Sequence, residues 1–202
     1  MITVIDYGMG NLRSVVKAVE KYTAAVRVSD DPASIRDSKA LIMPGDGAFG
    51  MAMENLKSGG WIEPLLEYLR GDGYFLGICL GFQLLFSTSE EYGHHRGLGL
   101  IPGSVVKFSD RSLKVPHMGW NTVELVSGSR YLAGVESDSH FYFIHSYYPE
   151  ISDRSWIVGQ VSYGTTFPCI VGRGNIIATQ FHPEKSHTVG MRIVENFVRA
   201  AC

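Results

Sequence analysis

The pattern of apolar and polar residues divides the chain into two halves with different periods. In the first 90 residues, short apolar runs alternate with segments in which apolar residues recur at helical spacing. The runs that predict strands occupy residues 1–6, 25–28, 40–43 and 74–78. The segments that predict helices lie near residues 11–23, 47–58 and 62–71. This alternation predicts an α/β fold with a mainly parallel central sheet and helices on both of its faces.

The second half consists of short β-rich runs separated by glycine, serine and aspartate. These runs lie near residues 104–108, 121–126, 140–144, 156–163, 169–173 and 175–180. We expect them to form antiparallel strands added to the sheet. A helix is predicted over about 187–200, and its apolar face carries Val189, Ile193, Val194, Phe197 and Val198.

Length and composition limit the class of protein. A chain of 202 residues with 45% apolar and 19% charged residues predicts one soluble globular domain, 1–202. A net charge of −2 gives no electrostatic basis for binding nucleic acid or an anionic membrane. Asp6 interrupts the first apolar run too early for a signal peptide or a membrane span. The three cysteines form no CxxC pair or disulfide framework, so we expect a cytoplasmic protein.

The segment Gly77-Ile78-Cys79-Leu80-Gly81 carries the clearest chemical signal. It follows apolar residues 74–76 and precedes residues 82–86, which can form a helix. A cysteine between strand and helix, with glycine two residues to either side, is the sulfur counterpart of the G-x-S-x-G nucleophile elbow. The N–H groups that begin the helix favour a thiolate, and the Leu80 N–H points toward an oxyanion beside the sulfur. The alternative is a buried structural cysteine in a tight glycine turn.

A nucleophilic cysteine needs a histidine base and a group that orients it. His182 follows the apolar run 176–181, so we expect it at a strand end, beside the elbow. Pro183 favours an extended backbone at His182, and residues i and i+2 of an extended segment face the same side. Glu184 can therefore accept a hydrogen bond from the imidazole. The alternative is a His-Pro-Glu turn on the surface, but together with the elbow the pattern favours a triad of Cys79, His182 and Glu184.

Other patterns predict neither a metal site nor a nucleotide site. The adjacent histidines 94–95 lie near the glutamates 90–91, but they lack the i, i+4 spacing of helical metal ligands. Gly8 and Gly10 begin a G-x-G pattern, but residue 13 is arginine, and no G-x-x-x-x-G-K-[ST] loop occurs. We therefore expect no metal and no cofactor.

With these residues, the chain resembles the triad class (class I) of glutamine amidotransferases, whose fold is flavodoxin-like. The segments Gly-Ile-Cys-Leu-Gly-Phe-Gln at 77–83 and Gln-Phe-His-Pro-Glu at 180–184 are typical of that class. Within the class, the chain is most similar to the glutaminase subunits of imidazole glycerol phosphate synthase, an enzyme of bacterial histidine biosynthesis. The segments that carry this similarity extend over nearly the whole chain, at residues 6–11, 44–49, 97–103, 114–121 and 141–148.

The resemblance implies the hydrolysis of L-glutamine to glutamate and ammonia. Cys79 would attack the side-chain amide and form a glutamyl thioester, which water then hydrolyses. His182 would transfer the protons, and Glu184 would orient the imidazole and support its charged form.

The resemblance also implies how the substrate is held. The oxyanion would accept hydrogen bonds from the Leu80 N–H and from an N–H of the loop Gly45, Asp46, Gly47. Gln83 and the backbone around Ser146 and Tyr147 would hold the amino-acid end of glutamine.

A partner subunit follows from the same resemblance. The chain would form a heterodimer with a (β/α)8-barrel cyclase, which receives the ammonia and produces imidazole glycerol phosphate and an aminoimidazole carboxamide ribotide. The phosphorylated precursor would bind the barrel. Asn11, Trp120 and Tyr142 match positions that face the barrel, and the alternative for the two aromatic residues is core packing.

Two residues depart from the family pattern. Asp46 stands where the family often has an apolar residue, so its carboxylate would repel an oxyanion unless it points away. Phe82 replaces a common methionine, which we interpret as a packing change. The alternatives to the histidine-pathway function are a glutaminase subunit of an anthranilate or aminodeoxychorismate synthase and a non-catalytic regulatory module, while a cysteine peptidase fits less well.

Overall fold

The computed structural model describes residues Met1–Cys202. Its main feature is a nine-stranded sheet in the order β2-β1-β3-β4-β13-β12-β11-β8-β9. The first five strands in that order are parallel: β2 (Val26–Ser29), β1 (Ile2–Ile5), β3 (Ala40–Met43), β4 (Tyr74–Ile78) and β13 (Ile176–Thr179). The other four continue the sheet in antiparallel order: β12 (Thr165–Arg173), β11 (Ile157–Tyr163), β8 (His117–Leu125) and β9 (Ser139–His145).

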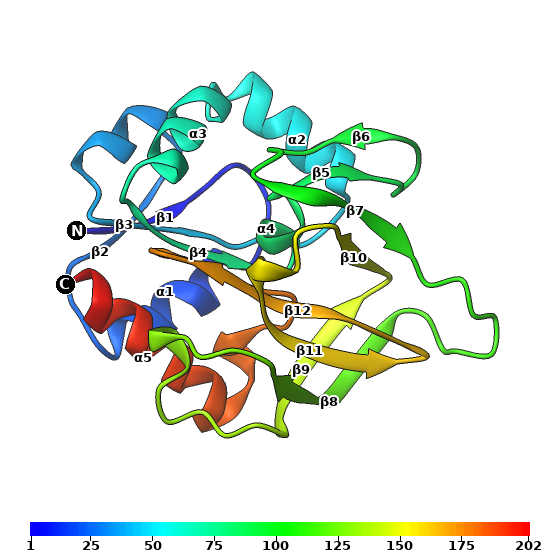
Figure 1. The fold of residues 1–202 in the computed structure, drawn as a ribbon. Helices are drawn as coiled ribbons and strands as arrows, with labels where there is room; N and C mark the ends of the chain where they lie inside the picture. Colours follow the sequence, from blue (N-terminus) through cyan, green and yellow to red (C-terminus); the bar gives the residue numbers. More distant parts are fainter.

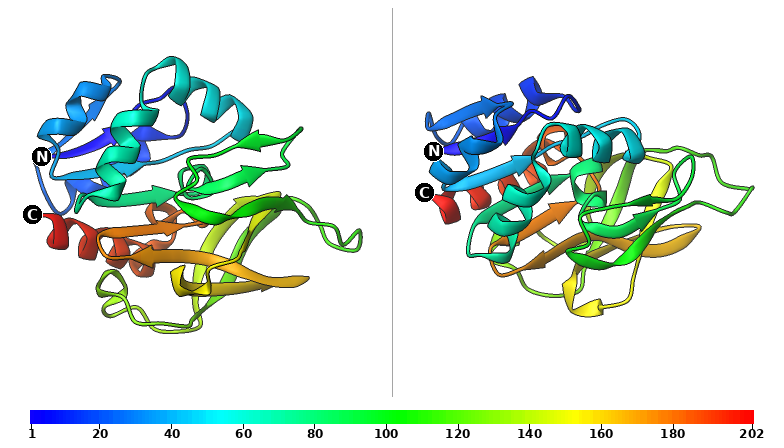
Figure 2. Two further views of the ribbon diagram at one scale, coloured as in Figure 1. Left: turned by 45° about the horizontal axis from the view of Figure 1, so that its top comes forward. Right: turned by 90° about the horizontal axis from the view of Figure 1, so that it is seen from above.

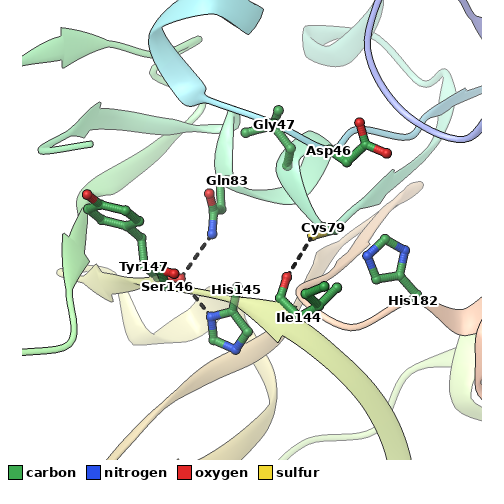
Figure 3. Close-up of a pocket in the computed structure, with 10 residues that line it drawn as sticks. Asp46, Gly47, Cys79, Gln83, Ile144, His145, Ser146, Tyr147 and His182 are labelled. Carbon is green, nitrogen blue, oxygen red and sulfur yellow. Dashed lines mark hydrogen bonds between the residues drawn. The ribbon is translucent and has the colours of Figure 1, made fainter. Parts of the chain in front are cut away.

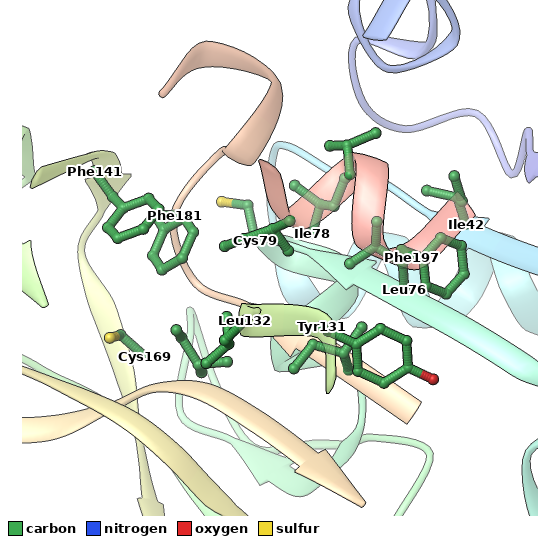
Figure 4. Packing of buried hydrophobic residues seen from close by; sticks show 14 of the residues in the cluster. Ile42, Leu76, Ile78, Cys79, Tyr131, Leu132, Phe141, Cys169, Phe181 and Phe197 are labelled. Carbon is green, nitrogen blue, oxygen red and sulfur yellow. The ribbon is translucent and has the colours of Figure 1, made fainter. Parts of the chain in front are cut away.

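Helices cover both faces of the parallel part, as Figures 1 and 2 show. One face carries α1 (Leu12–Glu20) and α5 (His187–Ala201), and the other carries α2 (Phe49–Ser58) and α3 (Ile62–Arg70). Alternate residues of each strand point to opposite faces, so Ile42 packs in one core and Leu41 in the other. Figure 4 shows the first core, where Ile42 and Leu76 of the sheet meet Phe197 of α5. None of the helices is both long and apolar enough to cross a lipid bilayer.

A second, four-stranded sheet lies beside the first. Its strands are β10 (Tyr147–Ile151), β7 (Ile101–Lys107), β5 (Phe86–Ser89) and β6 (His95–Arg96), in that order. The short helix α4 (Leu80–Gln83) connects β4 of the first sheet to β5 of the second. Four 3-10 helices complete the fold: η1 (Pro32–Asp37), η2 (Arg130–Leu132), η3 (Arg154–Trp156) and η4 (Pro183–Lys185).

The predicted fold class is confirmed, and three details of the prediction were wrong. The run 104–108 is not added to the nine-stranded sheet, because β7 belongs to the second sheet, where it pairs with β10 and β5. The run 175–180 is not an added antiparallel strand, because β13 pairs in parallel with β4 and lies at the centre of the sheet. The helix expected over 82–86 ends early, because Phe86 begins β5 and pairs with Ile101. The strand β10 was not predicted, since Pro149 interrupts its apolar pattern.

Candidate active site

The chain turns sharply at Cys79, between β4 and α4. Cys79 has φ +55° and ψ −105°, a conformation that an L side chain rarely adopts. The flanking glycines are required by close approach: a Cβ on Gly81 would lie 1.9 Å from the Met43 carbonyl oxygen, and one on Gly77 would lie 2.9 Å from the Gly81 carbonyl oxygen. The Phe82 and Gln83 N–H groups donate to the Cys79 carbonyl and begin the helix. The turn therefore presents the sulfur at the carboxyl edge of the sheet.

The parallel pairing of β13 with β4 brings the second candidate residue to the same edge. Thr179 lies opposite Ile78 in the register, so the segment that follows β13 runs beside the elbow. His182 lines the same cavity as Cys79, and Figure 3 shows its ring next to the sulfur. On its other side, His182 Nδ1 lies 2.8 Å from Glu184 Oε1. The three residues expected from the sequence thus lie together.

The surroundings of His182 favour its protonated form. Burial alone lowers the pKa of the imidazole, but the neighbouring Cys79, the hydrogen bond to Glu184 and the negative charges of both groups outweigh burial. They hold the pKa of His182 well above its usual range. The imidazole therefore carries a proton near neutral pH.

The backbone of His182 is held by a residue that the sequence did not single out. The buried Ser186 hydroxyl donates to the His182 carbonyl oxygen at 2.6 Å and accepts from the Tyr142 N–H at 3.0 Å. The His182 N–H in turn donates to the Tyr142 carbonyl oxygen at 3.1 Å. The backbone of His182 is therefore fixed against strand β9. A serine directly before a predicted helix does not signal such a role.

Ten residues line a cavity of about 190 Å³ around the sulfur. This volume is below the ~300–1,000 Å³ of pockets for drug-sized ligands, so the cavity suits a small metabolite rather than a polymer. The lining residues are Asp46, Gly47, Cys79, Leu80, Gln83, Ile144, His145, Ser146, Tyr147 and His182. Of these, Ile144 and His145 were not expected from the sequence.

The loop at residues 44–47 forms one wall of the cavity. The Asp46 carboxylate accepts a hydrogen bond from the Gly10 N–H at 3.2 Å, and in Figure 3 it points away from the sulfur. Within this loop, Gly45 packs closely against Tyr7, since a Cβ on Gly45 would lie 2.4 Å from the Tyr7 hydroxyl. That hydroxyl donates to the Pro44 carbonyl oxygen at 2.8 Å. The loop is thus fastened to the segment that follows β1, and Asp46 is oriented toward that segment.

The opposite wall contains the residues expected to hold the substrate. Gln83 Nε2 donates to the Tyr147 carbonyl oxygen at 3.0 Å and to Gln180 Oε1 at 2.9 Å. Gln180 Nε2 lies 3.9 Å from Cys79 Sγ, within hydrogen-bond range of sulfur. Gln83 therefore positions the Tyr147 backbone and Gln180, and Gln180 is a further polar neighbour of the Cys79 sulfur.

An exposed apolar strip lies on β8 and β9, next to this site. Trp120 is opposite Tyr142 in the sheet, and Met118 is opposite Ile144. Trp120 is 45% exposed, Met118 57% and Ile144 36%, so Trp120 is not core packing, whereas Tyr142 is partly buried. Trp120 also stacks on His187 with ring centroids 4.7 Å apart. Asn11 is exposed at the start of α1, where its side chain accepts from the Ser14 N–H.

The segment that contains the adjacent histidines 94–95 lies near the start of helix α2. No group of three or more His, Cys, Asp or Glu side chains in the chain is arranged to hold a metal ion. Glu91 instead accepts from the Phe49 N–H at 2.6 Å and caps helix α2, whose own N-cap residue offers no side-chain acceptor.

Comparisons with known proteins agree with the geometry. A family model described as "Glutamine amidotransferase class-I" matches residues 3–201. The "Imidazole glycerol phosphate synthase subunit HisH" of Syntrophotalea carbinolica is 50% identical over 203 residues, covering 98% of each chain. The protein of the same name from Desulfitobacterium hafniense is 48% identical over 197 residues, covering 98% of this chain and 93% of its own. A solved structure described as "Crystal structure of glutamine amidotransferase" has a TM-score of 0.76 at 19% identity and covers 100% of this chain and 99% of its own, which shows a shared fold.

Proposed function

This chain belongs to the class-I glutamine amidotransferase family, among the glutaminase subunits of imidazole glycerol phosphate synthase, and we propose that Cys79, His182 and Glu184 are its catalytic triad. Its function is to supply the synthase of histidine biosynthesis with ammonia from glutamine. The observation that supports the triad is the position of His182 between the Cys79 sulfur and the Glu184 carboxylate. The reaction then follows from the charges of these groups.

The first half-reaction forms a thioester. The Cys79 thiolate attacks the δ-carbon of glutamine, and the electron pair of the carbonyl bond moves onto oxygen. The imidazolium of His182 gives its proton to the amide nitrogen, the C–N bond breaks and ammonia leaves. Because the Glu184 carboxylate is hydrogen-bonded to Nδ1, it holds the ring with Nε2 toward the reacting atoms and stabilises the charged form.

The second half-reaction restores the enzyme. The neutral His182 takes a proton from a water molecule as this water attacks the thioester carbonyl. The tetrahedral intermediate collapses to glutamate and expels the Cys79 thiolate, so the protonated imidazole and the thiolate are regenerated together. No cofactor or metal enters either step.

The oxyanion of both tetrahedral intermediates needs N–H donors beside the sulfur. We assign this role to Leu80, the first residue of α4, and to the loop of Gly45, Asp46 and Gly47. Leu80, Asp46 and Gly47 line the cavity, and the orientation of the Asp46 side chain toward Gly10 removes its charge from the oxyanion. The amino-acid end of glutamine is assigned to Gln83, Ser146 and Tyr147 on the opposite wall.

The ammonia is used by a partner subunit of the synthase. The relatives are named as subunits of imidazole glycerol phosphate synthase, which implies a complex. We assign the partner as a (β/α)8-barrel cyclase that binds the phosphorylated precursor and forms a heterodimer with this chain. The exposed apolar strip of Met118, Trp120, Tyr142 and Ile144, together with Asn11, is the assigned contact surface, because apolar area of this kind is typical of protein interfaces.

The function is tested by separating the two ammonia sources. In the reconstituted synthase, Cys79→Ser should lower glutamine-dependent product formation by about 10³-fold or more, since it removes the nucleophile. The same variant should use added ammonium at the wild-type rate, because the partner's chemistry does not involve the thiol. Loss of the ammonium-dependent reaction would contradict the assignment, and so would full glutamine-dependent activity.

A further inference from the structure

A continuous chain of hydrogen bonds connects strand β8 to the wall that faces the substrate. His117 Nδ1 lies 2.9 Å from His145 Nε2, and His145 Nδ1 lies 2.8 Å from the Tyr147 carbonyl oxygen. At the other end, Asn121 Nδ2 lies 3.2 Å from His117 Nε2. Both imidazoles are buried, with 4% of His117 and 7% of His145 exposed. All four ring nitrogens therefore have partners inside the protein.

The neighbours fix the direction of every hydrogen bond in this chain. Asn121 Oδ1 accepts from the Thr122 N–H at 2.8 Å, so Nδ2 is the atom that donates to His117. His117 must then carry its proton on Nδ1 and donate to His145 Nε2. His145 in turn carries its proton on Nδ1 and donates to the Tyr147 carbonyl oxygen. Only the neutral form of each imidazole fits, because a second proton on either ring would face an N–H.

This series of hydrogen bonds ends at Tyr147, whose backbone belongs to the segment that we assign to binding of the substrate. The Tyr147 carbonyl oxygen accepts from His145 and also from Gln83 Nε2, at 2.8 Å and 3.0 Å. This oxygen thus holds the side chains of both His145 and Gln83. Gln83, His145 and Tyr147 all line the cavity. In Figure 3 the two donors converge on this segment from opposite sides. A change at His117 therefore reaches the cavity wall through a single intervening ring.

We propose that His117 and His145 are positioning residues for the substrate, and that they hold the Ser146–Tyr147 backbone and Gln83 where the α-amino and α-carboxylate groups of glutamine bind. This inference rests on the proposed function. It assigns the pair to binding of the amino-acid end rather than to chemistry at the sulfur. Loss of the pair should therefore raise the KM for glutamine and leave kcat nearly unchanged, because the bonds of the δ-amide are untouched.

Two variants of His117 separate the hydrogen bond from the packing. His117 stacks between Phe143 and Tyr163, with ring centroids 4.8 Å and 4.1 Å away. His117→Phe keeps an aromatic ring in this position but removes the donor to His145. His117→Asn loses the ring but places an amide N–H near the position of Nδ1–H. His140→Asn, on the same strand as His145 but exposed, is the matched control.

The experiment measures glutamine hydrolysis by the synthase reconstituted with its partner subunit. We expect His117→Phe to raise KM by about 10-fold, the effect of one lost buried hydrogen bond, with kcat within about 3-fold. We expect His117→Asn to recover most of the loss and His140→Asn to match the wild type. Equal losses in both His117 variants, or a wild-type KM in His117→Phe, would overturn the proposal.

A labelling experiment distinguishes a local effect from misfolding. Iodoacetamide lacks an amino-acid end, whereas a diazoketone analogue of L-glutamine has one, and alkylation of the Cys79 peptide is followed by mass spectrometry. His117→Phe should slow the analogue about 10-fold relative to wild type and leave the iodoacetamide rate unchanged. If the analogue is not slowed, the proposal is wrong. Failure of the wild-type synthase to hydrolyse glutamine would instead contradict the proposed function.

A milder variant covers the case in which His117→Phe does not fold. Asn121→Ala removes the amide that donates to His117 Nε2 and leaves both imidazoles in place. Asn121 is partly exposed, so its loss disturbs the core less. It should raise KM about 3-fold, since the tautomer of His117 is then less strongly fixed. An unchanged KM in a folded Asn121→Ala variant would also overturn the proposal.

Discussion

Replacing His117 by phenylalanine also tests a specific origin of acid sensitivity in this protein. Burial lowers the pKa of His117 to about 4. Burial, together with the neighbouring His117 and His182, lowers the pKa of His145 to about 3, against the opposing hydrogen bond to Tyr147. In the unfolded chain both groups titrate near pH 6.5. Between pH 6.5 and about 4, each histidine therefore binds a proton only when the protein unfolds.

The sign of the effect follows from this difference in bound protons. The unfolded state binds more protons in this window, so stability is fully present above pH 6.5 and is lost as the pH falls. From pH 7 to pH 5, one such histidine removes about 2 kcal/mol from the free energy of unfolding, and the pair removes about 4 kcal/mol. This loss is large beside the ~5–15 kcal/mol that a typical domain has in total.

The His117→Phe variant should lose stability at neutral pH but less of it in acid. At pH 7 the variant is expected to be about 1–3 kcal/mol less stable than wild type, because Asn121 and His145 each lose a partner. From pH 7 to pH 5 it should lose about 2 kcal/mol less than wild type, since one titrating histidine is gone. The two stabilities should therefore converge near pH 5. His182 titrates with the opposite sign, but it is present in both proteins and cancels in the comparison.

The assay is urea unfolding of the purified chain at pH 7, 6 and 5, followed by far-ultraviolet circular dichroism. The His140→Asn variant should lose stability in parallel with the wild type, because His140 is exposed. If the wild type and His117→Phe curves also stay parallel from pH 7 to pH 5, the buried neutral pair does not cause the acid sensitivity, and the reasoning is refuted.

Three further predictions address the elbow, the loop and the partner surface. Gly81→Ala should lower the free energy of unfolding by about 3 kcal/mol or more in the same urea assay, because its Cβ would lie 1.9 Å from a backbone carbonyl oxygen; a loss below about 1 kcal/mol would disagree. Asp46→Asn keeps an oxygen that accepts from the Gly10 N–H, so the glutaminase activity of the synthase should stay within about 3-fold of the wild type. A change above about 10-fold would mean that the charge of Asp46 acts on the oxyanion. Trp120→Ala should weaken binding of the partner subunit by about 10–100-fold in calorimetry, whereas Met51→Ala, which is 62% exposed on α2, should not.

The parallel half of the fold could be predicted because most of its strands, such as β1, β3 and β13, are buried on both faces. A continuous apolar run such as residues 40–43, with helical patterns in the neighbouring sequence, predicts a buried parallel strand. The position of Cys79 at the carboxyl edge was predictable for the same reason, since it follows the end of such a run, whereas the position of His182 at that edge depends on the parallel pairing of β13. Family membership followed from segments whose residues are constrained by close contacts, as at Gly81.

The remaining features depend on pairing between distant segments. The parallel position of β13 is decided by its partner β4, about a hundred residues earlier in the chain, and the local pattern of residues 175–180 contains no information about that pairing. Gln180, Ser186 and the His117–His145 pair act through hydrogen bonds to distant groups, and isolated polar residues in apolar segments do not reveal such partners. The orientation of Asp46 is another example, since Gly10 lies 36 residues away.

The central place of β13 has a consequence for how the enzyme matures. This strand follows all the others in chain order, yet it fills the gap between the parallel strands and the antiparallel ones. While the ribosome is still making residues 1–175, the two halves of the sheet have no strand to join them, and Cys79 has no imidazole beside it. Insertion of one four-residue strand joins the two halves of the sheet and brings the segment that carries His182 beside Cys79 in the same event.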